Sequence, residues 1–144
     1  GTWQHWCYTC AATSSSTGDI ILYVDGQAKL TLSAAATWDS TADFIMYMGR
    51  WGTYTFSDYA ACNIAEVTVW DYELSGTQVA NLWNNDGSGS GTPTDPQDTT
   101  GISTDPVHYW RMGSNMSGST TVLDEIGSVN LELHSGATTS TDVP

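Results

Sequence analysis

The chain has 144 residues, the length of one domain, and 16 Asp and Glu against 3 Lys and Arg give it a formal net charge of −13. Three cations are too few to neutralise a run of phosphates, which argues against nucleic-acid binding and against adsorption to an anionic membrane. No apolar run reaches the roughly 18 residues that a membrane helix needs. Charged residues make up 13% and aromatic residues 11% of the chain, a composition typical of a β-rich extracellular surface protein.

A β-hairpin is the first strong local prediction. Two apolar strand patterns, residues 20–24 and 28–32, flank Asp25-Gly26, and glycine accepts the positive φ that a tight hairpin turn requires. The next apolar run, residues 44–48, carries apolar side chains at every position and predicts an internal strand.

The clearest strand pattern, residues 64–70, precedes one short predicted helix. Ser75 is a favourable N-cap, and Gln78 stands three residues later, which completes a capping box. Leu74 before the cap and Val79 after it fit the hydrophobic staple that often accompanies such a start. The spacing predicts a surface helix of about two to three turns laid on β-structure.

Three cysteines form no metal-thiolate or redox pattern. Cys7 and Cys10 are spaced as a Cys-x-x-Cys, but they lie in a predicted strand, where an offset of three sends side chains to opposite faces. A disulfide from Cys62 to either of them stays open. Four tryptophans are assigned to the core: Trp3, Trp6, Trp70 and Trp83.

Five segments, in order, resemble the C-terminal half of a laminin-G-like domain of the concanavalin A-like lectin/glucanase superfamily. They are Gly1–Trp6, Ile21–Gly26, Met48–Arg50, Ile64–Trp70 and Leu74–Trp83. The resemblance implies an all-β fold: a two-sheet antiparallel jelly-roll sandwich with one short helix. Domains of this kind occur in extracellular and marine phage structural proteins.

Residues 107–113, with Asp124–Gly127, resemble the beginning of the same family's domain. The chain therefore carries segments that resemble the end of this domain, followed by segments that resemble its beginning. Segments that resemble the middle of the domain are missing. Three explanations compete. The chain spans two tandem domains of a longer protein, it forms one permuted and shortened sandwich, or its parts are completed by neighbouring copies. We favour one sandwich, in which residues 107–113 close the sheet against residues 64–70. The expected organisation is a C-terminal-half-like part (1–86), a Gly/Ser/Pro/Asp linker (87–105) and an N-terminal-strand-like part (106–144).

Catalysis is not expected. Glycoside hydrolysis needs two carboxylates facing one cleft, and the family's hydrolases carry a Glu-x-Asp-x-(x)-Glu cluster. The candidates here, Glu66, Asp71 and Glu73, do not have that spacing. We therefore expect no enzyme, and a glycosidase ranks last among the functions.

Calcium is the cofactor that the resemblance suggests, because rim acids and amides of this fold class hold a hard cation. Asp58 and Asn63 are the candidate ligands, with Asp39 and Asp43 in the facing loop. The alternative is that these acidic loop residues are solvated or cap turns.

An aromatic loop supplies the candidate ligand-binding residues: Arg50, Trp51, Tyr54 and Tyr59. Flat rings beside polar groups suit a sugar, whose C–H faces pack on the rings. The same rings also suit a subunit interface or the sandwich edge.

The prediction is a non-catalytic module of an extracellular or virion-surface structural protein, serving assembly and attachment. Its partners are other copies or subunits of that assembly. The alternative is a calcium-assisted carbohydrate-binding, lectin-like module that takes glycans.

Overall fold

The computed structural model describes eight stretches of the chain: 2–12, 17–37, 48–49, 60–83, 94–112, 116–117, 120–134 and 136–138. The chain divides into two compact units. Unit 1 comprises 1–39 and 68–108, together with the last residue, and unit 2 comprises 40–67 and 109–143.

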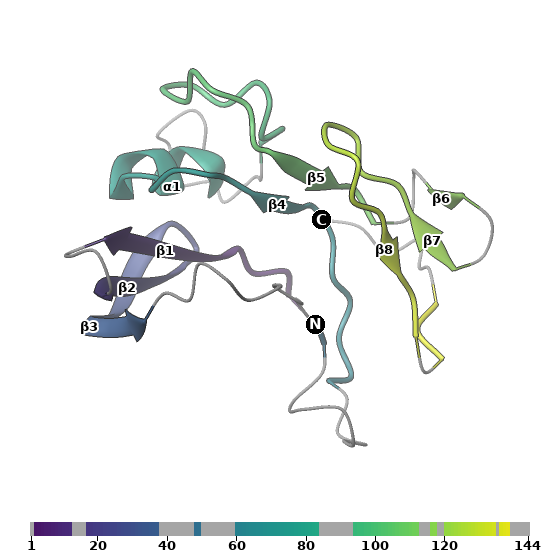
Figure 1. The fold of residues 1–144 in the computed structure, drawn as a ribbon, viewed down its shortest axis with the longest axis horizontal. Coiled ribbons are helices and arrows are strands. Elements are labelled where there is room, and N and C mark those ends of the chain that lie inside the picture. Colours follow the sequence, from purple (N-terminus) through teal and green to yellow (C-terminus); the bar gives the residue numbers. More distant parts are fainter. Residues whose placement is uncertain are drawn as a thin grey trace. The chain divides into compact units, whose positions relative to one another are not determined.

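Unit 1 contains a three-stranded antiparallel sheet in the order β1-β2-β3 (Figure 1). The strands are β1 (Trp6–Ala12), β2 (Thr17–Val24) and β3 (Gln27–Thr37). Val24 pairs with Gln27 across the turn, so the predicted hairpin is confirmed.

The hairpin turn needs glycine for two reasons. Asp25 and Gly26 both have positive φ, 52° and 72°, as a tight turn between twisted strands requires. A Cβ atom added at Gly26 would lie 3.1 Å from the Cα atom of Ala80. The Asp25 side chain also ties the turn to the start of β1, because its Oδ1 accepts a hydrogen bond of 2.9 Å from the backbone N–H of His5.

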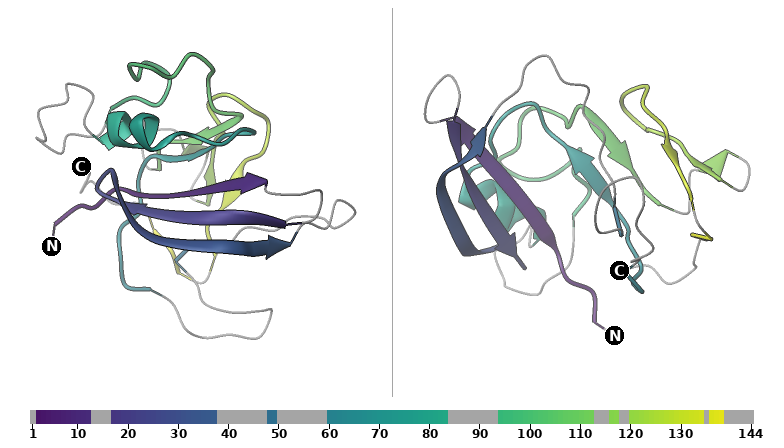
Figure 2. Two further views of the ribbon diagram at one scale, coloured as in Figure 1. Left: turned by 90° about the vertical axis from the view of Figure 1, so that its left-hand side faces the viewer. Right: turned by 60° about the horizontal axis from the view of Figure 1, so that its bottom comes forward.

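The helix α1 (Gly76–Trp83) starts as predicted. The Ser75 N–H donates to Oε1 of Gln78 at 2.8 Å, and the Gln78 N–H donates to Oγ of Ser75 at 3.3 Å, which is the reciprocal pattern of a capping box. The helix lies over one face of the β1-β2-β3 sheet (Figure 2), and its buried side chains are Val79 and Leu82. The core cluster of unit 1 consists of Tyr23, Leu74, Val79 and Leu82.

Part of the predicted linker is folded against α1. Thr94 donates its N–H to the Leu82 carbonyl at 3.0 Å, and the Asn81 amide donates to the Thr100 carbonyl at 2.8 Å. Thr99 is buried, and its hydroxyl lies 2.8 Å from that of Thr94. The bond from Thr94 occupies the carbonyl of Leu82 in the last helical turn, which has no partner inside the helix.

The strand predicted over 64–70 is shorter than expected. Strand β4 (Val67–Val69) pairs with β5 (His108–Trp110), which confirms that the segment at 107–113 closes onto this strand. Residues 64–66 are not in a strand, because Glu66 has a φ of 55°, outside the extended region.

Unit 2 contains a small antiparallel sheet in the order β6-β7-β8. Its strands, β6 (Met116–Ser117), β7 (Thr121–Val122) and β8 (Leu131–Glu132), are two residues long. The described part of the chain is thus mostly strands in antiparallel sheets with one short helix, as the predicted all-β class requires.

One of the four core assignments is wrong. Trp6 is 55% exposed, because Cys7 and Thr9 point from β1 toward α1 and strand alternation turns Trp6 to the opposite face. Trp70 packs against the core cluster, and Trp3 and Trp83 are half-buried.

Candidate functional site

One face of the β1-β2-β3 sheet is apolar and exposed. Directly opposite residues share a face of an antiparallel sheet, and Tyr8 pairs with Leu22, which pairs with Leu30. The same register groups eight residues, which we call the apolar face: Trp6, Tyr8, Cys10, Ile20, Leu22, Val24, Leu30 and Leu32.

The exposed fractions of its large side chains are high. They reach 55% for Trp6, 66% for Tyr8, 49% for Leu30 and 45% for Leu32. Isolated exposed apolar residues are ordinary on a protein surface, whereas a contiguous group on three paired strands marks a contact surface.

The opposite face of the same sheet forms the core of unit 1. Tyr23 is 7% exposed and Thr9 is 4% exposed, and Cys7 and Ile21 pack against the cluster built on α1. The sheet is therefore apolar on both faces, which differs from the apolar-in, polar-out alternation of a sheet with one solvated side.

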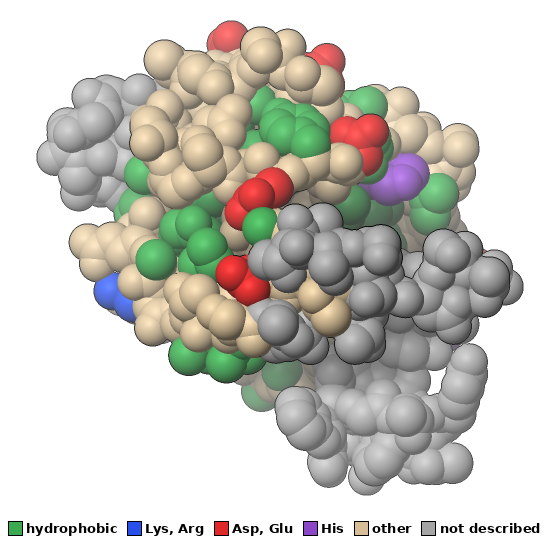
Figure 3. All heavy atoms as spheres, turned by 60° about the vertical axis from the view of Figure 1, so that its left-hand side comes forward, with side chains coloured by type: hydrophobic (Ala, Val, Ile, Leu, Met, Phe, Trp, Pro, Cys, Tyr) green, Lys and Arg blue, Asp and Glu red, His purple; other side chains and the backbone are tan. Residues whose placement is uncertain are grey.

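The eight residues of the apolar face include no carboxylate or cation, but Gln27 lies opposite Val24 and accepts a hydrogen bond from the Lys29 ammonium, so an amide and a cation border this face. Thr31 pairs with Ile21, which packs against the core cluster, so Thr31 lies on the other side of the sheet. On the view of the surface in Figure 3, acidic side chains occur at several places and basic side chains in one small area.

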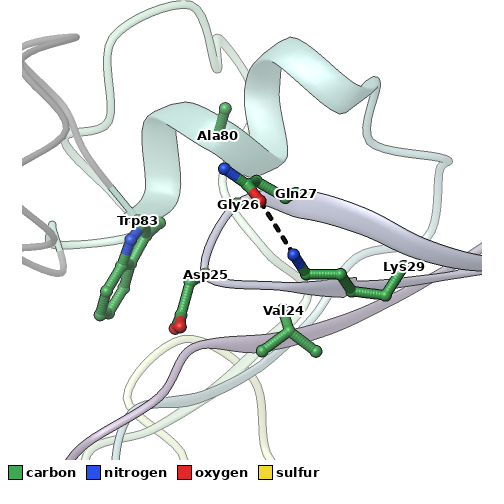
Figure 4. Close-up of a pocket in the computed structure, with 7 residues that line it drawn as sticks. All are labelled: Val24, Asp25, Gly26, Gln27, Lys29, Ala80 and Trp83. Carbon is green, nitrogen blue, oxygen red and sulfur yellow. Dashed lines mark hydrogen bonds between the residues drawn. The ribbon is translucent and has the colours of Figure 1, made fainter.

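A second feature of unit 1 is a shallow hollow of about 420 Å³ between the hairpin turn and α1. It is lined by Val24, Asp25, Gly26, Gln27, Lys29, Ala80 and Trp83 (Figure 4). The Lys29 ammonium donates to Oε1 of Gln27 at 2.9 Å, so the hollow presents an indole beside a carboxylate, an amide and a cation.

His5 stacks on Trp83, one of the residues that line this hollow. The ring centroids are 6.0 Å apart, with an angle of 13° between the planes. Burial lowers the pKa of His5, and the negative charge of Asp25 opposes that shift. Its Nδ1 atom is buried without a hydrogen-bond partner, as expected of an imidazole that stays neutral.

Most of the predicted site residues lie outside the described residues. These are Arg50, Trp51, Tyr54, Asp58 and Tyr59, together with Asp39, Asp43 and most of the strand predicted over 44–48. Asn63 is described and is exposed. The prediction of a ligand loop and a calcium site therefore stays a prediction.

The remaining candidates for chemistry are the metal-ligating side chains and the carboxylate of Glu66. Among the described residues, no three His, Cys, Asp or Glu side chains are grouped so that they could hold a metal ion. The carboxylate of Glu66 accepts a hydrogen bond from the Tyr109 hydroxyl. Across the ranges that the structure covers, no helix has the length and apolar character to cross a membrane.

The cysteines are free thiols in three different settings. Cys7 faces the core, and burial raises the pKa of its thiol to about 11. Cys10 is exposed on the apolar face, and Cys62 is exposed in unit 2. The strand places Cys7 and Cys10 on opposite faces, as predicted.

The apolar face itself was missed at the sequence level. Residues 28–32 alternate between apolar and polar side chains, which identifies one apolar face. Residues 6–10 and 20–24 carry apolar side chains on both faces of their strands, so alternation does not show which face is buried. Parity counted from the Asp25-Gly26 turn would pair Ile21 with Leu30, on the core side of the sheet. Leu30 lies opposite Leu22 because the register shifts between Leu22 and Tyr23, and no sequence signal marked that shift.

Comparison with known proteins supports the family that the sequence resembles. A sequence model of the Concanavalin A-like lectin/glucanases superfamily, of the laminin-G-like type, matches residues 1–80. The chain belongs to this family. No curated protein and no solved structure matches it.

Proposed function

We propose that the chain is a non-catalytic module of an extracellular or virion-surface structural protein, serving assembly and attachment. The observation that carries this proposal is the apolar face, where Trp6 and Tyr8 stand more than half exposed beside Leu30 and Leu32. Interface cores are enriched in aromatic residues and depleted of charges, and the apolar face has both properties. The proposed architecture is a two-sheet jelly-roll sandwich, supported by the family and by the antiparallel sheets.

The test asks whether the apolar face is available for contact when the chain is dilute. Nile red, a neutral dye that brightens on apolar surface, is titrated against about 1 µM protein. We expect binding to wild type and a several-fold loss of emission in Leu30→Lys, because a charge interrupts the apolar surface. Thr31→Lys is the matched control: it adds the same charge at the next position, outside the apolar face, and should bind dye as wild type does.

If wild type binds as little dye as Leu30→Lys, the apolar face is already covered and the proposal is contradicted.

The second candidate is a calcium-assisted, carbohydrate-binding module. The hollow at the hairpin turn favours it, since Trp83 stands beside Asp25, Gln27 and Lys29. A glycan array with calcium, and again with a chelator, tests this candidate. Retention of one sugar class that Lys29→Ala loses would locate the site at the hollow, whereas loss in Trp51→Ala would locate it in the aromatic loop.

Calcium is tested separately by its effect on the melting temperature, which a bound ion raises. If Asp58 is a ligand, Asp58→Ala abolishes the rise. Asp98→Ala, at an exposed acid of unit 1, serves as the control. An equal rise in wild type and Asp58→Ala would remove Asp58 from the site, and a blank array under both conditions would reject the lectin.

A further inference from the structure

We infer that the hollow at the hairpin turn binds a small zwitterion, a molecule that carries an ammonium group and a carboxylate a few bonds apart. The inference is independent of the assembly function, which rests on the apolar face. It gives the hollow a ligand of a different class from the sugar considered above.

One part of the hollow is aromatic and acidic. His5 connects its two groups, because the His5 backbone N–H donates to Oδ1 of Asp25 at 2.9 Å and the His5 ring stacks on Trp83. The bond to His5 uses one oxygen of the Asp25 carboxylate and leaves Oδ2 for a ligand. An indole beside a carboxylate suits an ammonium group, which is attracted by the ring face and by the negative charge. Burial lowers the pKa of His5, so its ring is neutral near pH 7 and adds no competing positive charge.

The other part of the hollow is basic. The Lys29 ammonium donates to Oε1 of Gln27 at 2.9 Å, and its remaining N–H groups and the Gln27 amide group stay as donors for a carboxylate. In Figure 4, the Lys29 ammonium points toward Gln27, and the Asp25 carboxylate and the Trp83 ring lie apart from this pair. Opposite charges at two places in one hollow suit a ligand with the complementary arrangement.

The fold of unit 1 holds the walls of the hollow in place. A Cβ atom at Gly26 would lie 3.1 Å from the Cα atom of Ala80 and 3.4 Å from the Cβ atom of Trp83, so the turn lies directly against α1. Preformed walls reduce the conformational entropy that is lost on binding. The volume of about 420 Å³ lies in the range of small-molecule sites.

Charge separates a zwitterion from other small ligands. Lys29 is the only lysine of the chain, and both arginines, Arg50 and Arg111, belong to unit 2. A chain of net charge −13 repels a simple anion before it reaches Lys29, whereas a simple cation in the hollow is repelled by Lys29 itself. A zwitterion has no net charge, and each of its two charges meets an opposite one. A neutral sugar would use neither charge.

An amide NMR titration tests the site with glycine betaine and with γ-butyrobetaine, a homologue whose charges are further apart. We expect at least one of them to bind with a dissociation constant of about 0.1–1 mM, since the hollow is shallow. The shifts should concentrate at the Gly26 amide and the Trp83 indole N–H, which report the place of binding.

Three further probes show whether both charges matter. 3,3-Dimethylbutyrate has the shape of glycine betaine without the positive charge, and choline lacks the carboxylate. Each should bind at least about fivefold more weakly than the better betaine, because one charged contact is lost. Methyl α-glucoside, a neutral sugar, should also bind at least about fivefold more weakly, because it uses neither charge.

Charge-removing variants locate the two ends of the ligand. Lys29→Gln removes the cation, and Asp25→Asn removes the anion but keeps an oxygen that can accept from the His5 N–H. Asparagine also tolerates the positive φ of this position. Each variant should weaken betaine binding at least about fivefold. Arg111→Gln and Asp98→Asn make the same charge changes outside the hollow and should stay within about twofold of wild type.

Three results overturn the inference. They are no binding of either betaine, equal binding of a betaine and any of the three further probes, and betaine binding that the hollow variants weaken no more than the two controls. The Nile red experiment separates this inference from the assembly function. Dye binding by a chain that binds neither betaine leaves the assembly function standing, and betaine binding by a chain that binds no dye rejects the assembly function alone.

Discussion

Unit 1 and the turn at Asp124 in unit 2 are stabilised by different kinds of interaction. In unit 1, an amphipathic helix buries Val79 and Leu82 on a sheet whose strands have 7 to 11 residues. In unit 2, the strands of the β6-β7-β8 sheet are two residues long, and a side-chain carboxylate organises the backbone beside it.

The Asp124 carboxylate accepts four backbone hydrogen bonds. Its Oδ1 accepts from the N–H groups of Tyr109, Ile126 and Gly127 at 3.0 to 3.2 Å, and its Oδ2 accepts from Val129 at 3.2 Å. Short strands leave many backbone donors without a ladder partner, and a carboxylate is the strongest side-chain acceptor for them. Apolar burial is thus replaced, locally, by charge-assisted hydrogen bonds.

The buried Trp110 adds an apolar anchor to the same turn. Its side chain is 2% exposed, and its indole N–H donates to the Val129 carbonyl at 2.7 Å. The guanidinium of Arg111 lies 5.3 Å from the Tyr109 ring centroid and pairs with Glu125 at 3.0 Å. This partly exposed ion pair is worth little by itself.

Leu82→Ala should have the largest effect, because it opens a cavity in the core of unit 1. We expect the free energy of unfolding to fall by about 2–5 kcal/mol, measured by denaturant titration. Leu30→Ala removes the same atoms from a half-exposed position and should change it by about 0.5 kcal/mol or less in dilute protein. Similar decreases of the unfolding free energy in the two variants would show that packing of α1 on the sheet is not the main source of its stability.

Asp124→Ala should come next. It leaves four backbone donors without their acceptor, and hydrogen bonds to a charged group contribute about 1.5–3 kcal/mol each in mutational series. Since water will replace some of them, we expect a loss of about 2–3 kcal/mol and faster amide exchange at Gly127. Asp124→Asn keeps one acceptor oxygen and should lose less. An Asp124→Asn variant as stable as wild type would mean that the carboxylate charge is unimportant.

These two sites also show how far sequence reasoning reaches. The helix start was predicted from Ser75 and Gln78, because a capping box is local and its partners are three residues apart. Asp124 was read only as part of a family-like segment. Three of its four bonds are local, whereas the one from Tyr109 spans fifteen residues and depends on the fold. Trp6 was misassigned for a related reason: alternation gives two faces, and only packing decides which one is covered.

Ser75→Ala should have a smaller effect, near 1 kcal/mol, because it removes one half of the capping box. The Gln78 side chain would keep its second contact, a hydrogen bond of 3.1 Å from its amide to the Gly101 carbonyl. Thr77→Ala, at an exposed position in the first turn, is the control and should lie within about 0.5 kcal/mol of wild type. A Ser75→Ala variant as stable as this control would contradict the capping role.

The smallest expected effect is a pH dependence from His5. Its folded-state pKa lies below the ordinary value of 6.5, so the unfolded chain takes up the proton first as the pH falls. The free energy of unfolding should therefore decrease below pH 6.5, and it should decrease less between pH 7 and 5 in His5→Phe, which keeps a ring against Trp83. His134→Phe, at an exposed histidine, should keep the wild-type slope.

The sequence alone determined the local elements and the family of this protein. The turn at Asp25-Gly26, the capped helix and the apolar strands follow from φ preferences, side-chain capping and periodicity, all of which act within a few residues. Tertiary structure decided which sheet face α1 covers, how residues 94–105 fold back on the helix, and that β4 begins only after Glu66. These outcomes depend on packing between distant segments, and one choice among them left Trp6 and Tyr8 exposed on the apolar face.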